Sequence, residues 1–385
     1  MRRLARREFL VATVAAPLAL GQASAAAPAR PVALARHRRY EEDPLPVLSR
    51  MFDQLGGLGR LVRGKTVAIK LNLGGPADRR LGHLPHERTN WVHPGIIGAT
   101  LHLMDQAGAH RIRLLEGSHF TAAPLAEHMY QAGWEPMDLV RAARRVELEN
   151  TNTLGQGKKY FRVAVPGDAY IYPGFDLNHS YADCDVFVSL AKLKEHVTTG
   201  VTLSMKNCFG ITPTSIYGED AGDSDPNEKP GGGRGSTCHA GSRQPSKCAP
   251  SELDPASPRD PTYRVPRIIV DIVTARPVDL AIIDGVESMG GNEAVFRAGA
   301  FPVSAGVLIA GTNCVNTDAV AAAVMGYDPL ATRGAPPFER CDSTLELAEL
   351  RGLGTRDLNR IEMTGEAIRD VTYDFRAARK AARVG

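Results

Sequence analysis

The residues best suited to chemistry are concentrated in one segment of the chain, residues 191–213. Within sixteen positions it contains three lysines, one histidine and one asparagine, namely Lys192, Lys194, His196, Lys206 and Asn207. The segment directly follows residues 185–190, an apolar run that predicts a buried strand. In an open parallel α/β sheet, ligands bind beyond the carboxyl ends of the strands. Ammonium and imidazole groups at such an edge suit an anionic small molecule, such as a carboxylate, a phosphate or an enolate.

Polar side chains also stand where the other expected strands end. They are Lys70 and Asn72 after the first strand, Glu116, Ser118 and His119 after the second, Asp284 and Glu287 after the fourth, and Asp318 at the start of an alanine-rich helix. Carboxylates that face lysines alter one another's pKa values, which the removal of a proton next to a carbonyl group requires. We therefore expect catalytic roles for Asp284 and Glu287 together with the five residues above. Lys70, Asn72 and Asp318 are expected to bind the substrate.

Each of these groups also has a structural interpretation. The lysines could be solvated loop charges, and Lys206 could do no more than cap the C-terminus of a helix. Asp284 could cap a turn before Gly285, and Asp318 could interact with the dipole of its own helix.

Metal and iron–sulfur chemistry has little support in the sequence. His83, His86 and His93 could ligate a metal, but this loop spacing is more typical of surface histidines, and no metal site is expected. The six cysteines contain no C-x-x-C spacing, which argues against a ferredoxin-type cluster or a zinc ribbon. Cys238 and Cys248 could form a disulfide in an oxidising compartment.

P-loop, H-E-x-x-H, G-x-S-x-G and G-x-G-x-x-G motifs in the required context are also absent, and the identity of any cofactor stays open.

The first 25 residues resemble a twin-arginine export signal. Arg6 and Arg7 precede an aromatic residue and a leucine, an alanine-rich run follows, and residues 23–25 form a small-residue cleavage pattern. The run is too short to span a bilayer in the mature chain, and no other stretch approaches that length. We expect recognition by the twin-arginine export machinery and a periplasmic or extracellular location. An ordinary secretory signal and an uncleaved anchor are the alternatives.

The rest of the chain predicts an α/β fold with a parallel or mixed sheet and helices on both faces. Strands are expected at residues 66–73, 110–117, 185–190, 277–285 and 305–311, and helices at 94–108, 124–133 and 315–326. Residues 26–45 are assigned to a linker and 46–385 to a single domain. Within that domain, residues 218–261 are rich in glycine, proline and charge, which predicts either a lid over the site or a flexible insertion.

Without its first 25 residues the chain carries no net charge, and no nucleic-acid partner is expected.

Four segments together resemble a known family, the domain of unknown function 362. They are AKLKEH at 191–196, TLSMKNCFGITP at 202–213, DGVESMGGN at 284–292 and NTDAVAAAVMGYDP at 316–329. The resemblance extends over about residues 65–330 and implies a single α/β domain. It also implies that some members carry ferredoxin-type iron–sulfur modules, whose cysteine motifs this chain lacks.

These observations favour an exported enzyme that acts on a small anionic organic substrate. Lysines would hold the anion or a developing enolate, while His196 or a carboxylate moves the proton. A periplasmic protein that binds a ligand without converting it is one alternative, and an accessory subunit of a redox enzyme is another. Catalysis requires a base within hydrogen-bonding reach of the bound substrate, whereas binding alone does not.

Overall fold

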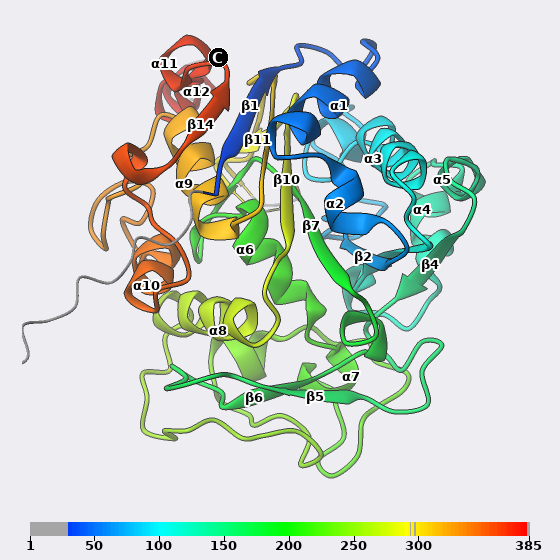
Figure 1. Ribbon diagram of the computed structural model, residues 1–385. Coiled ribbons are helices and arrows are strands. Elements are labelled where there is room, and N and C mark those ends of the chain that lie inside the picture. The colour runs from blue at the N-terminus through cyan, green and yellow to red at the C-terminus, as the bar shows by residue number, and fades with distance from the viewer. Residues whose placement is uncertain (1–29, 293, 296–297, 383–385) are drawn as a thin grey trace, which may run out of the picture.

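An eight-stranded mixed sheet forms the centre of the molecule (Figure 1). The computed structural model describes residues 30–382 apart from 293 and 296–297, so the expected export signal lies outside the described residues. In spatial order the strands are β14 (Met363–Gly365), β1 (Val32–Arg36), β13 (Val307–Gly311), β10 (Leu280–Gly285), β7 (Val186–Lys192), β2 (Thr66–Lys70), β3 (Arg111–Glu116) and β4 (Val146–Asn150). Only β13 runs against its neighbours within this sheet.

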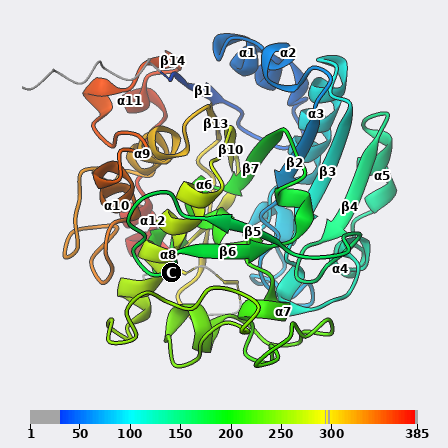
Figure 2. The same ribbon diagram turned by 60° about the horizontal axis from the view of Figure 1, so that its bottom comes forward.

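Helices cover both faces of the sheet, which confirms the expected α/β class (Figures 1 and 2). One face carries α1 (Leu45–Gln54), α2 (Leu58–Val62), α3 (Pro94–Gln106), α4 (Leu125–Gln131) and α5 (Pro136–Arg141). The other carries α6 (Leu203–Asn207), α8 (Pro261–Ala275), α9 (Cys314–Val324) and α10 (Thr344–Leu350). Shorter elements are α7 (Thr214–Tyr217), α11 (Ile368–Val371), α12 (Phe375–Ala382) and the two-stranded pairs β5–β6 (Phe161–Ala164, Gly174–Leu177), β8–β9 (Glu195–His196, Gly200–Val201) and β11–β12 (Ser288–Gly290, Phe301–Val303).

The central strands are apolar on both sides because each face of the sheet has its own core. In β7, Val188 and Leu190 pack with α1 and α3 on one face, whereas Phe187 and Ala191 pack with the helices of the other. Strands buried on both faces read as continuous apolar runs, and this made β7 recognisable in the sequence. No helix in the described part of the chain has the length and apolar character needed to cross a membrane.

The N-terminal boundary of the domain differs from the expectation. Residues 26–45 were assigned to a linker, but residues 32–36 form β1, which lies between β13 and β14 with its first four side chains buried. A strand of five residues with distant partners gives only a short apolar signal, so the sequence pattern did not separate it from a linker.

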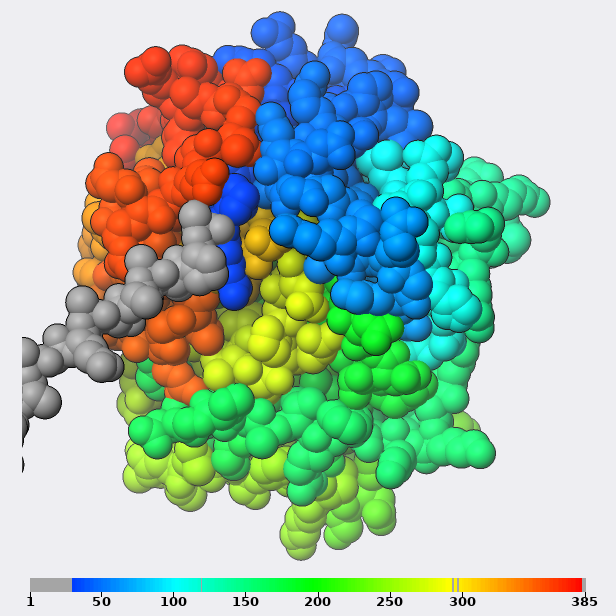
Figure 3. Space-filling view, viewed as in Figure 1, coloured from blue at the N-terminus to red at the C-terminus, as the bar shows by residue number. Residues whose placement is uncertain are grey.

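The long insertion folds against the domain although it contains little regular structure. The green β5–β6 hairpin and the lime insertion together cover the bottom of the molecule (Figure 3). A buried ion pair ties the insertion to α8, with 2.8 Å between Arg264 Nη1 and Glu252 Oε2. Cys238 is buried and Cys248 is half-buried, and both are free thiols.

Candidate functional site

A cavity of about 750 Å³ lies at the carboxyl edge of β2, β3 and β7. Lys70 ends β2 and Glu116 ends β3, while Lys194 and His196 follow β7. The insertion supplies the remaining wall through Glu219, residues 231–235 and His239. Of the ten residues for which the sequence predicts a catalytic or substrate-binding role, six line this cavity, namely Lys70, Asn72, Lys194, His196, Lys206 and Asn207. Glu116, which also ends a predicted strand, lines it as well.

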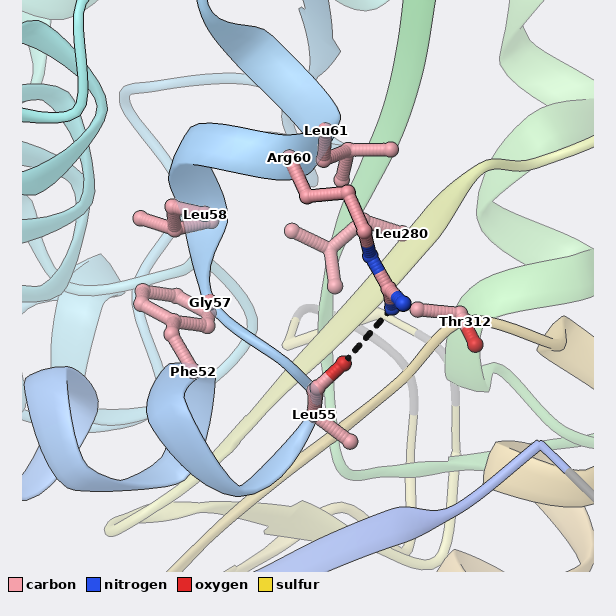
Figure 4. A pocket seen from close by; sticks show the side chains of 8 residues that line it. All are labelled: Phe52, Leu55, Gly57, Leu58, Arg60, Leu61, Leu280 and Thr312. Atoms are coloured by element: carbon pink, nitrogen blue, oxygen red, sulfur yellow. Dashed lines mark hydrogen bonds between the residues drawn. The ribbon is translucent and has the colours of Figure 1, made fainter.

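A second pocket, at the start of β10, is far smaller, and Figure 4 shows the residues that line it. It measures about 80 Å³ and is lined mainly by apolar side chains of α1, α2 and the start of β10. Its one charged group is Arg60, which donates from Nη2 to the carbonyl oxygen of Leu55 at 3.2 Å. A space of this size holds a few water molecules, so the large cavity is the candidate site.

A buried ion pair forms one wall of the cavity. Lys70 Nζ lies 2.5 Å from Glu116 Oε1 and 2.6 Å from the carbonyl oxygen of Leu71. The carboxylate also accepts from the backbone N–H groups of Leu73 at 2.7 Å and Gly117 at 2.8 Å. Charge-assisted bonds to both carboxylate oxygens hold Glu116 in one orientation. The pair therefore presents a fixed ammonium group at the end of β2.

Two asparagines extend this polar wall. Asn207 donates from Nδ2 to Ser189 Oγ at 3.0 Å and accepts from Asn72 Nδ2 at 3.0 Å. This orientation leaves Asn72 Oδ1 buried and without a hydrogen-bond partner among the described residues, and the same is true of Thr202 Oγ1. Both residues line the cavity. Buried polar atoms are nearly always paired, so these two oxygens are unsatisfied acceptors beside the cavity.

The segment after β7 contributes the other groups named from the sequence. Lys194 Nζ donates to the carbonyl oxygen of Asn90 at 3.2 Å, and Lys206 Nζ lies 4.7 Å above the ring centroid of Phe209. His196 Nδ1 accepts from the backbone N–H of Thr198 at 3.1 Å. An accepting Nδ1 places the proton of a neutral imidazole on Nε2.

The insertion brings residues to the cavity that the sequence analysis did not select. The Arg234 guanidinium donates from Nε to the carbonyl oxygen of Thr212 at 2.7 Å and from Nη2 to Asn152 Oδ1 at 3.1 Å. Burial lowers the pKa of Arg234 from its usual value. Its position inside a glycine run was the only available signal, and such runs are usually turns. Among the described residues, the lining thus combines four basic side chains, Lys70, Lys194, Lys206 and Arg234, with two carboxylates, Glu116 and Glu219.

Lys192 and Asp284 do not line this cavity; both are fully buried and belong to a separate cluster. Lys192 Nζ lies 3.0 Å from Asp284 Oδ2, 2.6 Å from the hydroxyl of Tyr40 and 2.9 Å from the carbonyl oxygen of Glu87. Burial lowers the pKa of Lys192 and raises that of Tyr40 well above its usual value. These donors and acceptors satisfy one another. Through Tyr40, the cluster therefore fixes the segment after β1 to the ends of β7 and β10.

Glu287 belongs to the same cluster. Its carboxylate pairs with the guanidinium of Arg88, with 2.6 Å between Arg88 Nη2 and Glu287 Oε1. The ring of His93 stacks on that of Tyr40 at a centroid distance of 3.8 Å. Tyr40 was not selected from the sequence because it lay in the presumed linker.

Asp318 does not line the cavity; it hydrogen-bonds to the start of α6, the helix that supplies two residues of the cavity wall. Its carboxylate accepts from Ser204 N at 2.8 Å, Ser204 Oγ at 2.5 Å and Met205 N at 2.9 Å. These bonds fix the start of α6, the helix that ends in Lys206 and Asn207. Burial raises the pKa of Asp318 to about 7.

The three histidines considered as metal ligands have other functions in the structure. Both ring nitrogens of His86 are occupied, one by Asn90 Oδ1 at 3.1 Å and one by the carbonyl oxygen of Ala77 at 2.9 Å. His93 Nδ1 accepts from Gly95 N and caps α3, and His83 is exposed. Across the described part of the chain, no three histidine, cysteine or acidic side chains gather as metal ligands do.

Comparison with known proteins gives a match to one relative over about half of the chain and a match to one family model over more than half of it. Over 184 residues the chain is 28% identical to the thylakoid-associated protein sll1697 from Synechocystis sp.. The aligned part covers 47% of this chain and 50% of that relative, so the similarity spans about half of each protein. A family model matches residues 67–323, which include every residue of the cavity wall. Since this match extends over more than half of the chain, the protein belongs to the family described as a domain of unknown function, DUF362.

Proposed function

We propose that the protein is an enzyme that binds a small anionic organic substrate in the cavity at the carboxyl edge of β2, β3 and β7. The observation that supports this most strongly is the charge of the lining, in which the part of the chain that the structure describes supplies four basic side chains and two carboxylates. Basic groups in a confined, partly desolvated cleft attract anions more strongly than the same groups in water.

The contacts of the basic groups suggest different roles. Lys70 is engaged by Glu116, Leu71 and Asn207, so we assign it to the fixed wall that orients the substrate. Lys194 and Lys206 would bind the anionic group or an enolate that develops from it. Arg234 would add positive charge from the insertion.

His196 is the best candidate for moving the proton. Both oxygens of Glu116 already accept hydrogen bonds, which makes its carboxylate a poor base. His196 lies in β8, and its neutral form carries the proton on Nε2, so in this tautomer it is the acid that would protonate a substrate oxygen. To remove a proton from carbon, it would first have to move its own proton to Nδ1 and give up the hydrogen bond from Thr198 N. A reaction at a carbon next to a carbonyl group would require this residue to exchange a proton with the substrate.

Proton exchange provides the test. A panel of carboxylic acids and phosphate esters, each with a hydrogen next to a carbonyl group, is incubated with the protein in D2O and followed by proton NMR. Loss of that signal is expected with the parent chain, and His196→Gln should abolish exchange while ligand binding measured by calorimetry is retained. Lys206→Met should weaken both. Binding without exchange in the parent chain would favour a ligand-binding protein instead, the main alternative.

We also propose that the protein is exported through the twin-arginine route and acts in the periplasm or outside the cell. This rests on the pattern of residues 1–25. Delivery of a folded accessory subunit for a redox enzyme would use the same route, but the basic cavity favours small-molecule chemistry.

A further inference from the structure

Polar and charged side chains line the interior of the cavity, whereas apolar side chains stand at its opening. Lys70, Glu116 and Asn207 in the interior are all buried. Phe120 and Val197 also line it, yet their exposed fractions are 37% and 46%. Because these two side chains contact both the cavity and the solvent, they stand at its opening.

The two apolar residues come from separate elements. Phe120 ends the 3₁₀ turn Ser118–Phe120 that follows β3, and Val197 lies in the turn between β8 and β9. Scattered exposed apolar side chains are ordinary on a protein surface, but two that line the same polar cavity suggest a ligand contact.

The backbone of Phe120 adds an independent observation. Its φ angle is +65°, in the left-handed region that bulky residues rarely adopt. Gly233 of the insertion faces the ring, since a Cβ atom at position 233 would lie 3.3 Å from it. A strained conformation that presents an aromatic ring at a cavity is typical of functional sites.

The size of the cavity indicates how much of the ligand is apolar. At about 750 Å³ it falls within the range of about 300–1,000 Å³ that accommodates drug-sized molecules. A two- or three-carbon acid would occupy only a small part of this space. Phe209 and Ala294, both buried, supply further apolar wall.

We propose that the ligand is an amphipathic organic acid whose anionic group meets the basic interior and whose aliphatic or aromatic body contacts Phe120 and Val197. This deepens the proposed function and rests on it, because the anionic group is the part that Lys194 and Lys206 would bind. The apolar contacts determine which acids are selected.

Two series of probes test the assignment. One consists of straight-chain carboxylates from acetate to octanoate, and the other of the matched alkyl phosphates, so that the series also distinguish the two anionic groups. Dissociation constants are measured by calorimetry at constant ionic strength for the parent chain and for Phe120→Ala/Val197→Thr. Leu350→Ala is the matched control, because Leu350 is exposed and is not among the residues that line the cavity.

Affinity of the parent chain is expected to rise about three- to fourfold for each methylene group that becomes buried. The double variant should lose most of this dependence on chain length, and Leu350→Ala should keep it. Affinity that does not change along the series, together with weaker binding of every probe by Lys206→Met, would overturn the amphipathic ligand and leave the anion site intact. If no probe binds the parent chain, both proposals fail.

Discussion

Lysines that look alike in the sequence have different functions because their surroundings differ. Lys192 and Lys194 are two residues apart, yet the first contacts Asp284 and the second lines the cavity. Lys206 lies above an aromatic ring at the cavity wall. The local sequence of all three is similar, and only the positions of their distant partners separate a structural lysine from one that can bind an anion.

Substitution of two lysines by methionine should separate these functions. Lys192→Met leaves the buried carboxylate of Asp284 without its cation, and the free energy of unfolding should fall by about 3–5 kcal/mol. Lys206→Met should change stability by about 0.5 kcal/mol or less but reduce anion binding by about 1.5–3 kcal/mol. Urea denaturation and calorimetry with inorganic phosphate measure the two effects. If Lys192→Met is as stable as the parent chain, the structural role assigned to the buried cluster is wrong.

At the scale of elements, the sequence predicts long apolar runs well and short or polar segments poorly. β2, β3, β7, β10 and β13 lie where strands were expected, and α3, α4 and α9 lie where helices were expected. β1 was missed because its partners, β13 and β14, are more than 250 residues away along the chain. Sequence patterns report the burial of a segment but not which distant segment covers it.

Helix α3 begins with a cap that depends on pH. His93 Nδ1 accepts from Gly95 N at 3.0 Å, which requires an unprotonated nitrogen. Burial, the largest effect, lowers the pKa of His93 to about 4, although Asp284 acts in the opposite direction. Between about pH 6.5 and pH 4 the unfolded chain therefore binds a proton that the folded chain does not. The contribution of His93 to the free energy of unfolding is therefore present in full above pH 6.5 and is lost as the pH falls from 6.5 to 4.

Asparagine at position 93 should preserve the cap and remove the titration, since its side-chain oxygen accepts from the same N–H group. His93→Asn is expected to reduce the acid loss of unfolding free energy between pH 6.5 and 4 by about 3 kcal/mol. The measurement is urea denaturation at several pH values, and His83→Asn, at an exposed position, is the control. An equal slope for all three chains would show that the pKa of His93 is the same in the folded and the unfolded chain.

At the scale of the whole molecule, the candidate site is formed by segments that lie far apart in the sequence. Strand ends supply Lys70 and Glu116, the segment after β7 supplies Lys194 and Lys206, and the insertion supplies Arg234. The strand-end part was predictable because parallel strands place their carboxyl ends at one edge. The contribution of the insertion was not, because its composition resembles a flexible loop and its contacts depend on partners such as the Arg264–Glu252 ion pair.

The order of the strands also bears on export. β1 begins at residue 32, soon after the expected cleavage pattern, and it pairs with β14 at residues 363–365. The sheet can therefore be completed only when nearly the whole chain has been synthesised, which suits a route that transports folded proteins. Within the proposed export signal, Arg6 and Arg7 are the residues that a twin-arginine receptor would recognise.

Replacement of Arg6 and Arg7 by lysine preserves the charge but removes the guanidinium groups. The double variant is expected to stay in the cytoplasm in folded form, with its precursor uncleaved, as shown by cell fractionation and immunoblotting. Arg2→Lys/Arg3→Lys changes two arginines outside the pair and should be exported like the parent chain. If the variant at positions 6 and 7 is exported equally well, the segment acts as a general secretory signal, because that pathway tolerates either basic residue before the apolar run.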